Sequence, residues 1–438
     1  MTGVLKPITA LLLSAAILLT GNGLFGVLVP FRADYEQFSR LQIGLLGSAY
    51  FLGLMIGCLV CPGVIGRVGH IRAFVAFTAT ATVTPLLQAL WIDTSAWVVL
   101  RVVNGVCFAG LFMSIESWLT STAEANTRGR ILAVYTLINL TVVTLGMQMI
   151  ALAPVSGFQL FSIVAVLYSL AAVPIALTGA IAPNPPVAAR LQLGHLLSVS
   201  PAAVVGCLCA GFANAAFWSL APLYGKAAGL TIVETATMLT FAVLAGALAQ
   251  WPVGVLSDRI GRRVPLIATS LGAAFAGIAL FAFAGAGVVV VMTLAALYGS
   301  CSFLIYTMSV AHANDLVPRE RAVEVSSGLL LTFSGAAVIG PLVAAFVMAR
   351  LGAGALFLYT AAVHGAVALV LLVRLMQRPE LPVDESESFV YVPRTTPAVF
   401  GLDPRTEPAA DQLEDQPADM PSSADDDPVP RTGSGSIG

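Results

Sequence analysis

Charged residues are scarce in this sequence of 438 residues. Asp, Glu, Lys and Arg together make up only 10% of the chain, while 58% of it is hydrophobic. A water-soluble domain of this length carries roughly a quarter of its residues as charged side chains, so the composition excludes a soluble globular protein. Lysine is limited to Lys6 and Lys226, and the arginines fall in short groups between apolar stretches. Such groups form no continuous basic face, so we expect no nucleic-acid partner.

Cysteine and histidine are also few, and their positions argue against an enzyme. All six cysteines lie inside apolar stretches, where small buried side chains are expected rather than disulfides. Met55, Cys58 and Cys61 share one helix face that would suit a soft metal, but no second such cluster faces them. We therefore predict no metal, no cofactor and no catalytic residue. The histidines are scattered over four elements: His70, His195, His312 and His364.

Long apolar runs are what the chain has instead, and its mean hydropathy is +0.90. Runs of about 18 residues or more, enough to cross a lipid bilayer, recur along residues 1–376. They lack the alternation of an outer-membrane barrel, so we predict an all-α membrane protein. The first run is too long for a signal peptide and is expected to be retained. The predicted spans are 8–30, 42–65, 72–91, 96–118, 130–154, 158–181, 198–222, 232–256, 263–285, 287–313, 322–349 and 352–376.

The basic residues indicate how these spans are oriented. With a cytoplasmic N-terminus, the inner loops and chain ends hold thirteen Lys and Arg, and the outer loops hold four. Because positive residues concentrate on the cytoplasmic side, both termini are predicted to lie in the cytoplasm. A composition rich in Ala, Gly, Val and Arg but poor in Lys is typical of a GC-rich bacterium, which places the protein in a bacterial inner membrane.

The two halves of the chain repeat one another. Gly-Arg-Val-Gly-His-Ile-Arg at 66–72 is followed 192 positions later by Asp-Arg-Ile-Gly-Arg-Arg at 258–263, and the loops around 128–130 and 319–321 repeat at nearly the same spacing. We predict two pseudo-symmetric six-helix halves with a substrate path between them. The predicted divisions are an N-terminal half over 1–181, a linker over 182–197, a C-terminal half over 198–376 and a tail over 377–438.

At this point the sequence resembles the major facilitator superfamily, over residues 1–376. The second loop meets the family signature Gly-x-x-x-Asp-Arg-x-Gly-Arg-Arg in full, whereas Pro62, Gly66 and His70 replace three of its residues in the first half. Arg101 with Gly105 also resembles a family motif. Glu-Ser-Trp-Leu at 116–119 is similar to a little-characterised bacterial branch of the superfamily. The resemblance implies twelve transmembrane helices and transport of a solute by alternating access.

The resemblance also implies an inner gate around the signature loops. In it, Asp258 would cap and pair with the region near Arg128–Arg130 and hold the inner side closed. For Glu116 two roles stay open: a proton carrier, or a partner of Arg67, Arg72 or Arg130 in the same gate. On the outer side, Asp34 is either a solvated loop acid or a gate residue that meets a basic side chain. The predicted gating residues are Gly254, Asp258, Arg259, Gly261, Arg262, Arg263, Arg67, Gly69, Glu116 and Arg130.

Arg101 is the most costly residue in the chain, because a charge inside a span needs a wet cavity or a partner. It would bind an anionic or polar substrate group or balance a nearby proton carrier; alternatively it extends to the outer interface. In the family, spans 1, 4, 7 and 10 line the cavity. Polar and aromatic residues on those spans are predicted to form the substrate pathway. Alternatively, such polar side chains stabilise contacts between helices by hydrogen bonds. The predicted pathway residues are Arg101, Asn22, Asn104, Asn214, Trp218, Tyr298 and Tyr306.

The tail holds thirteen of the 23 acidic residues and is rich in Pro, Asp and Ser, so it is predicted to be disordered. Two apolar stretches within it, 389–394 and 399–405, are candidates to dock on the inner loops or on an unidentified cytoplasmic partner. For the whole chain we predict a monomeric secondary transporter of a small polar or weakly anionic solute, with protons as a candidate coupling ion. A drug or metabolite efflux pump of the same fold is one alternative, and a non-transporting sensor that signals through the tail is another.

Overall fold

Long helices make up almost all of the structure, a computed structural model that describes residues 2–123, 127–178, 193–377 and 388–405. No strand occurs within these ranges. Twelve helical stretches are long and apolar enough to cross a membrane, which confirms the predicted all-α membrane fold. The helices are α1 (Thr2–Tyr35), α2 (Arg40–Val68), α3 (His70–Leu90), α4 (Thr94–Thr122), α5 (Arg128–Gln148), η1 (Met149–Leu152), α6 (Gln159–Ala176), α7 (Leu193–Val199), α8 (Pro201–Ala227), α9 (Ile232–Ile260), α10 (Arg263–Ala282), α11 (Val288–Ser302), α12 (Leu304–Asn314), α13 (Arg319–Leu351), α14 (Ala355–Gln377) and η3 (Pro397–Leu402).

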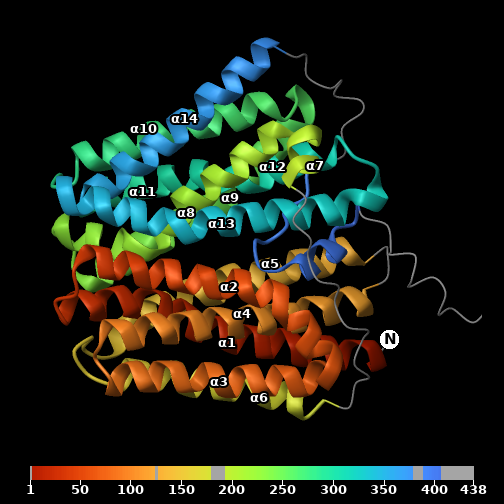
Figure 1. Cartoon of the computed structure of the whole chain (residues 1–438), viewed down its shortest axis with the longest axis vertical. Coiled ribbons are helices and arrows are strands. Elements are labelled where there is room, and N and C mark those ends of the chain that lie inside the picture. The colour runs from red at the N-terminus through yellow and green to blue at the C-terminus, as the bar shows by residue number, and fades with distance from the viewer. Residues whose placement is uncertain (1, 124–126, 179–192, 378–387, 406–438) are drawn as a thin grey trace, which may run out of the picture.

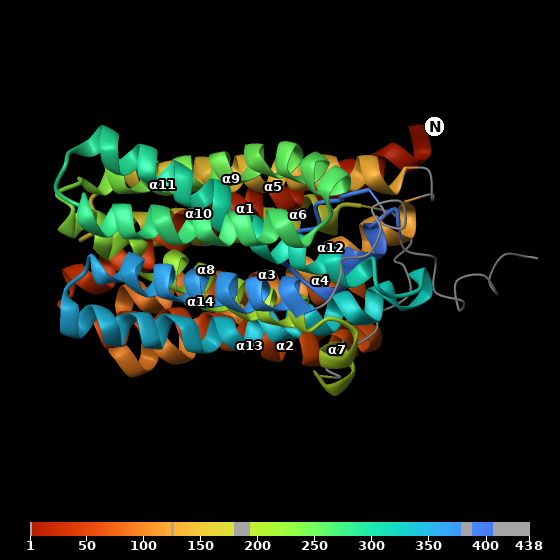
Figure 2. The ribbon, with the colours of Figure 1, turned by 90° about the horizontal axis from the view of Figure 1, so that it is seen from above.

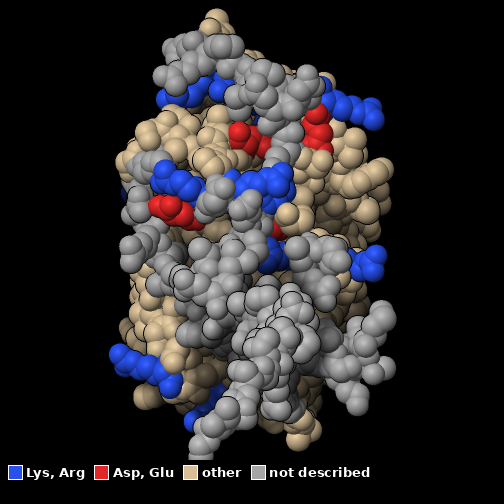
Figure 3. All heavy atoms as spheres, turned by 90° about the vertical axis from the view of Figure 1, so that its right-hand side faces the viewer, with Lys and Arg blue, Asp and Glu red and all other residues tan. Residues whose placement is uncertain are grey.

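The helices run side by side in two bundles, α1–α6 and α8–α14 (Figures 1 and 2). The bundles meet where α2 packs against α13, α1 against α8 and α5 against α9. One end of the molecule carries the α2–α3 and α9–α10 loops, and we call it the inner end because the sequence predicts it to face the cytoplasm. Arginine side chains gather on this end (Figure 3). Of the predicted linker, residues 182–192 lie outside the described ranges, and the remainder includes the short helix α7.

The internal repeat is visible in how corresponding helices begin and end. Ser39 and Gln42 form a capping box at the start of α2, and Thr231 and Glu234 form the same box at the start of α9, 192 positions later. Each helix then runs for 29 residues. Gly69 and Gly261 end them with nearly identical backbone angles, φ +83° and +86°. Because side chains with a Cβ avoid this region, both halves use glycine to make the same turn.

The outer end is closed by contacts between the halves. Lys226 at the end of α8 forms an ion pair of 2.5 Å with Asp34 of α1, so Asp34 meets a basic side chain of the other half. Arg40 donates to the carbonyl oxygen of Met348 at 2.7 Å. Gly44 lets α2 approach α13 so closely that a Cβ there would lie 2.5 Å from the Cβ of Ala345. These contacts join the two halves at the outer end.

The tail departs from its predicted disorder over residues 388–405. These residues pack against the inner end and include the 3-10 helix η3, whose residues Val399 and Phe400 are fully buried. Both belong to the second apolar stretch that the sequence marked as a docking candidate. The prediction of disorder used the composition of the whole tail, in which acidic residues and proline outweigh these few apolar residues. The rest of the tail, 378–387 and 406–438, lies outside the described residues.

Candidate functional site

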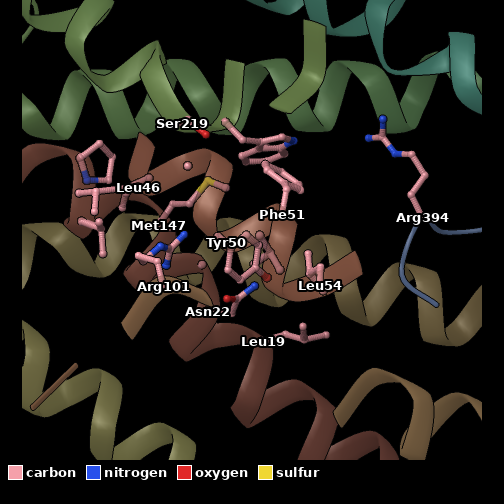
Figure 4. Close-up of a pocket in the computed structure, with 18 of the residues that line it drawn as sticks. Leu19, Asn22, Leu46, Tyr50, Phe51, Leu54, Arg101, Met147, Ser219 and Arg394 are labelled. Atoms are coloured by element: carbon pink, nitrogen blue, oxygen red, sulfur yellow. The ribbon is translucent and has the colours of Figure 1, made fainter. Parts of the chain in front are cut away.

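A cavity of about 270 Å³ lies between the halves, near the middle of the bundle (Figure 4). Its wall is mostly apolar and aromatic, and includes Phe51, Phe112 and Trp218. The first half supplies most of it, from α1, α2, α4 and α5, while α8 supplies the opposite side. No Asp or Glu among the described residues lines it. The carboxylates considered as proton carriers, including Glu116 and Asp34, thus lie outside the pocket.

Arg101 of α4 points into this pocket and is only 9% exposed. Its Cζ lies 4.5 Å from the centre of the Tyr50 ring and 5.5 Å from that of Phe25. Such cation–π contacts contribute up to about 2 kcal/mol when they are desolvated, but they leave the N–H donors free. Its Nε has no hydrogen-bond partner among the described residues. The guanidinium therefore points inward, which contradicts the alternative that it extends to the outer interface.

The other predicted pathway residues divide into two groups. Asn22 and Trp218 line the pocket with Arg101. The remaining four are buried between helices outside its lining. Asn104 donates to Thr84 at 3.2 Å, and Asn214 accepts a hydrogen bond from Ser302 at 3.0 Å. The Tyr298 ring packs on Phe217 and Phe357, and the Tyr306 ring on Phe333.

Several lining residues were missed because they lie on spans 2 and 5 or in the tail. Tyr50 and Asn139 are polar residues within spans, a signal that the sequence offered without showing which way they face. Arg394 and Thr395 come from the segment after α14 and reach the inner side of the pocket. Arg394 ends the stretch 389–394 that the sequence marked as a docking candidate, but the sequence did not indicate that its side chain reaches the pocket.

Glu116 has different partners from those predicted. The carboxylate is fully buried near the inner end of α4 and accepts three hydroxyl hydrogen bonds. Tyr135 donates from 3.0 Å, and Thr395 and Thr396 of the tail donate to the two carboxylate oxygens. Among the described residues, the side chains that bond this carboxylate are thus hydroxyl donors and not the arginines of the predicted gate.

The signature loop of the second half forms a compact ionic network. Arg262 bonds Asp258 at 2.5 Å, Asp315 at 2.9 Å and the hydroxyl of Ser257 at 2.7 Å. Asp258 also accepts two hydrogen bonds from the backbone N–H of Phe389, at 3.0 and 3.1 Å. The expected contact between Asp258 and the start of α5 is thus replaced by contacts with its own loop and with the tail.

The first half has a weaker version of this network. His70 stands 192 positions before Arg262, and its Nε2 lies 2.9 Å from the hydroxyl of Ser117. Gly66 offers no carboxylate at the position of Asp258. Three of the predicted gating arginines, Arg67, Arg130 and Arg259, are exposed at the inner end. Arg263 is half-buried beside the network. Within the described ranges, no three His, Cys, Asp or Glu side chains group as metal ligands.

Comparison with known proteins identifies a family and several similar proteins. The sequence profile of the Major Facilitator Superfamily matches residues 11–327 and, in a second alignment, 204–402. An uncharacterized MFS-type transporter of Enterobacter sp. (strain 638) is 26% identical over 385 residues, which are 85% of this chain and 97% of the relative. A crystal structure of a variant of the nucleoside transporter NupG has a TM-score of 0.71 at 12% identity, covering 84% of this chain and 99% of that one. A bacterial homolog to the human lysosomal transporter Spinster, inward-facing and occupied, has a TM-score of 0.67 at 16% identity, covering 87% and 98%.

Proposed function

Because the chain belongs to the major facilitator superfamily, we propose that it moves a small organic anion across the membrane by alternating access, with Arg101 as the anion-binding residue. The observation that carries this proposal is the unpaired guanidinium in a pocket with no described carboxylate. A buried charge without a partner is unfavourable by several kcal/mol. An anionic ligand that enters the pocket would supply the missing partner.

The residues of the pocket wall indicate which class of anion the pocket suits. Phe51, Phe112 and Trp218 offer an apolar and aromatic surface, and Asn22 and Asn139 offer amide groups. A pocket of this kind binds a ligand through a few polar contacts that fix its orientation and a larger apolar area. We therefore propose a small monocarboxylate with an apolar or aromatic body. Arginine suits a carboxylate because its planar fork can make two parallel hydrogen bonds.

Alternating access is supported by the asymmetry between the two ends. The outer end is held by the Asp34–Lys226 ion pair and by the close approach of α2 and α13. At the inner end, in contrast, a segment of the tail lies between the halves and contacts α4, α5 and α13. The structure thus resembles an inward-facing carrier whose inner opening is filled by its own chain. We propose that both termini lie in the cytoplasm, as the basic loops indicate.

The proposal can be tested with pairs of ligands that differ in charge alone. Purified protein is heated with aromatic and aliphatic monocarboxylates and with the neutral amide of each, and the apparent melting temperature is measured. A ligand that binds the folded state raises that temperature. We expect at least one acid, but not its amide, to stabilise the native protein.

Arg101→Ala is expected to abolish this stabilisation. Arg101→Lys should restore little of it, because one point charge replaces a bidentate contact; a loss of about 1.5–3 kcal/mol corresponds to roughly 10- to 100-fold in affinity. Arg350→Ala removes an exposed arginine from the outer end of α13 and is the matched control. If acids and amides stabilise equally, or if Arg101→Ala still responds to the acids, Arg101 is not the anion-binding residue.

A further inference from the structure

Residues 388–405 fill the inner end between the two halves (Figures 1 and 2). The segment has no regular secondary structure from residue 388 to residue 396, bends at Arg394 and Thr395, and then forms η3. Four apolar side chains along it, Val392, Val399, Phe400 and Leu402, are at most 3% exposed. Burial of this extent means that the segment is seated in a groove and does not lie loosely over the surface.

The segment is anchored to the first half through Glu116 and Thr120 of α4. Thr395 and Thr396 donate their hydroxyl hydrogens to the two oxygens of the Glu116 carboxylate. Thr120 donates to the carbonyl oxygen of Ala398 at 3.2 Å. Hydrogen bonds to a buried carboxylate are stronger than those between neutral groups. Side-chain and main-chain groups of the segment therefore both have partners in this helix.

Anchors to the second half lie in the signature loop and beside it. The backbone N–H of Phe389 donates to both oxygens of Asp258. The Phe389 ring lies over Gly254, the first glycine of the signature, where a Cβ would collide with the ring. The Phe389 ring thus packs on Gly254, which has no side chain, and Asp258 accepts the hydrogen bonds of the main chain beside it. The segment bridges the two halves.

The middle of the segment forms one wall of the central pocket. Arg394 and Thr395 both line the pocket. The Arg394 guanidinium lies 5.3 Å from the centre of the Phe333 ring and 5.7 Å from that of Tyr306. Its Nη1 has no hydrogen-bond partner among the described residues. In Figure 4, Arg394 lies on the opposite side of the pocket from Arg101, on the ribbon of the segment after α14.

We propose that the inner opening is a binding site for an extended peptide, that this chain's own residues 388–405 are its occupant, and that they close the pocket toward the cytoplasm until they leave. This inference rests on the proposed function, because it concerns access to the same pocket. The polar anchors can exchange their partners for water when the segment leaves. Removal of the segment would uncover Glu116, Asp258 and the pocket together.

Docking is tested by a disulfide between the segment and α4. A Cβ at Gly401 would lie 3.5 Å from the Cβ of Thr120, which is within the range of natural disulfides. In the full-length chain with its six native cysteines replaced, Thr120→Cys with Gly401→Cys should form a disulfide on mild oxidation. Thr120→Cys with Ser388→Cys is the control, because Ser388 lies at the opposite end of the segment and should not react. If the first pair forms no more disulfide than the control, docking is wrong.

Closure is tested with Leu54→Cys as the only cysteine, because Leu54 lines the pocket. A membrane-impermeant maleimide is added to the cytoplasmic face of inside-out vesicles, and the labelling rate is measured. Phe400→Asp places a charge in the buried seat and should raise the rate about tenfold. Ser388→Asp adds the same charge at an exposed residue of the same segment and should leave the rate unchanged.

Misfolding of Phe400→Asp would also make it label faster, so a second pair of variants tests closure without that substitution. A chain that ends at residue 387 should label at the faster rate, and a chain that ends at residue 405 should label as slowly as the full chain. Equal labelling of these two chains would overturn closure. Neither readout needs a transported solute. Failure of anion binding with successful cross-linking would thus reject the proposed function alone, and the reverse result would reject the peptide site alone.

Discussion

Arg262 bonds several residues of the ionic network at the inner end of the second half. Its side chain is 3% exposed and lies between the carboxylates of Asp258 and Asp315. A buried guanidinium of this kind depends on its partners, because removal of one leaves charge without compensation. In the first half, His70 contacts the hydroxyl of Ser117 and the ring of Trp118 at the corresponding place. Arg262 thus has charged partners, whereas these two partners of His70 are uncharged.

Asp258→Asn separates the charge of this residue from its shape. Arg262 keeps Asp315, so we expect the fold to persist. The N–H of Phe389 loses a charged acceptor, which weakens docking by about 1 kcal/mol, or roughly fivefold. Maleimide labelling of Leu54→Cys should accelerate by that factor. Asp93→Asn, which alters an exposed helix cap at the outer end, should have no effect, and an unchanged rate in Asp258→Asn would contradict this role.

The residues of the site were only partly predictable from the sequence. Arg101 could be singled out because the energetic cost of a charge inside a span demands an explanation. Asn104 and Asn214 carry no such cost and satisfy part of their hydrogen-bonding capacity between helices. An amide in a span fits a cavity or a helix contact equally well, and the sequence alone does not show the direction of each face. Tyr50 was missed for the same reason.

At the scale of helices, α2 and α4 cross closely in the first half. Gly53 and Gly105 face each other there, and a Cβ at Gly105 would lie 2.9 Å from the Cα of Gly53. Small residues allow such close approach in a membrane, where packing rather than the hydrophobic effect associates helices. The crossing also positions Tyr50 under Arg101. The motif of Arg101 and Gly105, noted in the sequence, thus combines the proposed binding residue with a close helix contact beside it.

Gly105→Val is expected to force these helices apart. Overpacking at a close contact destabilises by about 1–3 kcal/mol, and the movement would also displace Tyr50 from Arg101. The apparent melting temperature of the purified variant should fall, and its response to monocarboxylates should be lost. Gly63→Val changes a glycine of α2 that has open space around it. Equal melting temperatures for the two variants would show that the crossing tolerates a side chain.

The helices themselves were predicted well because each span is long and apolar, and the repeat indicated the two halves. The ordered part of the tail was not predicted well, because the whole tail was expected to be disordered. Disorder follows from a composition averaged over its whole length, whereas Val399, Phe400 and Leu402 are only three of the 6 residues of η3. Whether so short an apolar stretch becomes ordered depends on a groove in another part of the chain. The sequence does not display that groove.

For the whole molecule, the two ends use different means of closure. The outer end is held by contacts between the halves themselves, whereas the inner end is filled by a segment that belongs to neither bundle. In the proposed mechanism, motion of one half against the other opens the first end, and the second needs release of the segment as well. Access from the inner end would then be controlled independently of the motion of the halves.

The absence of a described carboxylate beside Arg101 has an electrical consequence. In the proposed mechanism, Arg101 gives the pocket one positive charge once the segment that carries Arg394 has left, and a bound monoanion neutralises that charge. Across a membrane, one elementary charge corresponds to about 2.3 kcal/mol per 100 mV. A voltage that is negative inside would draw the empty site inward and let the neutral, loaded site return outward, so that voltage alone drives export of the anion. In liposomes with an imposed potassium diffusion potential, we expect reversal of the voltage to reverse net flux; equal flux at both polarities would mean that a cation travels with the anion.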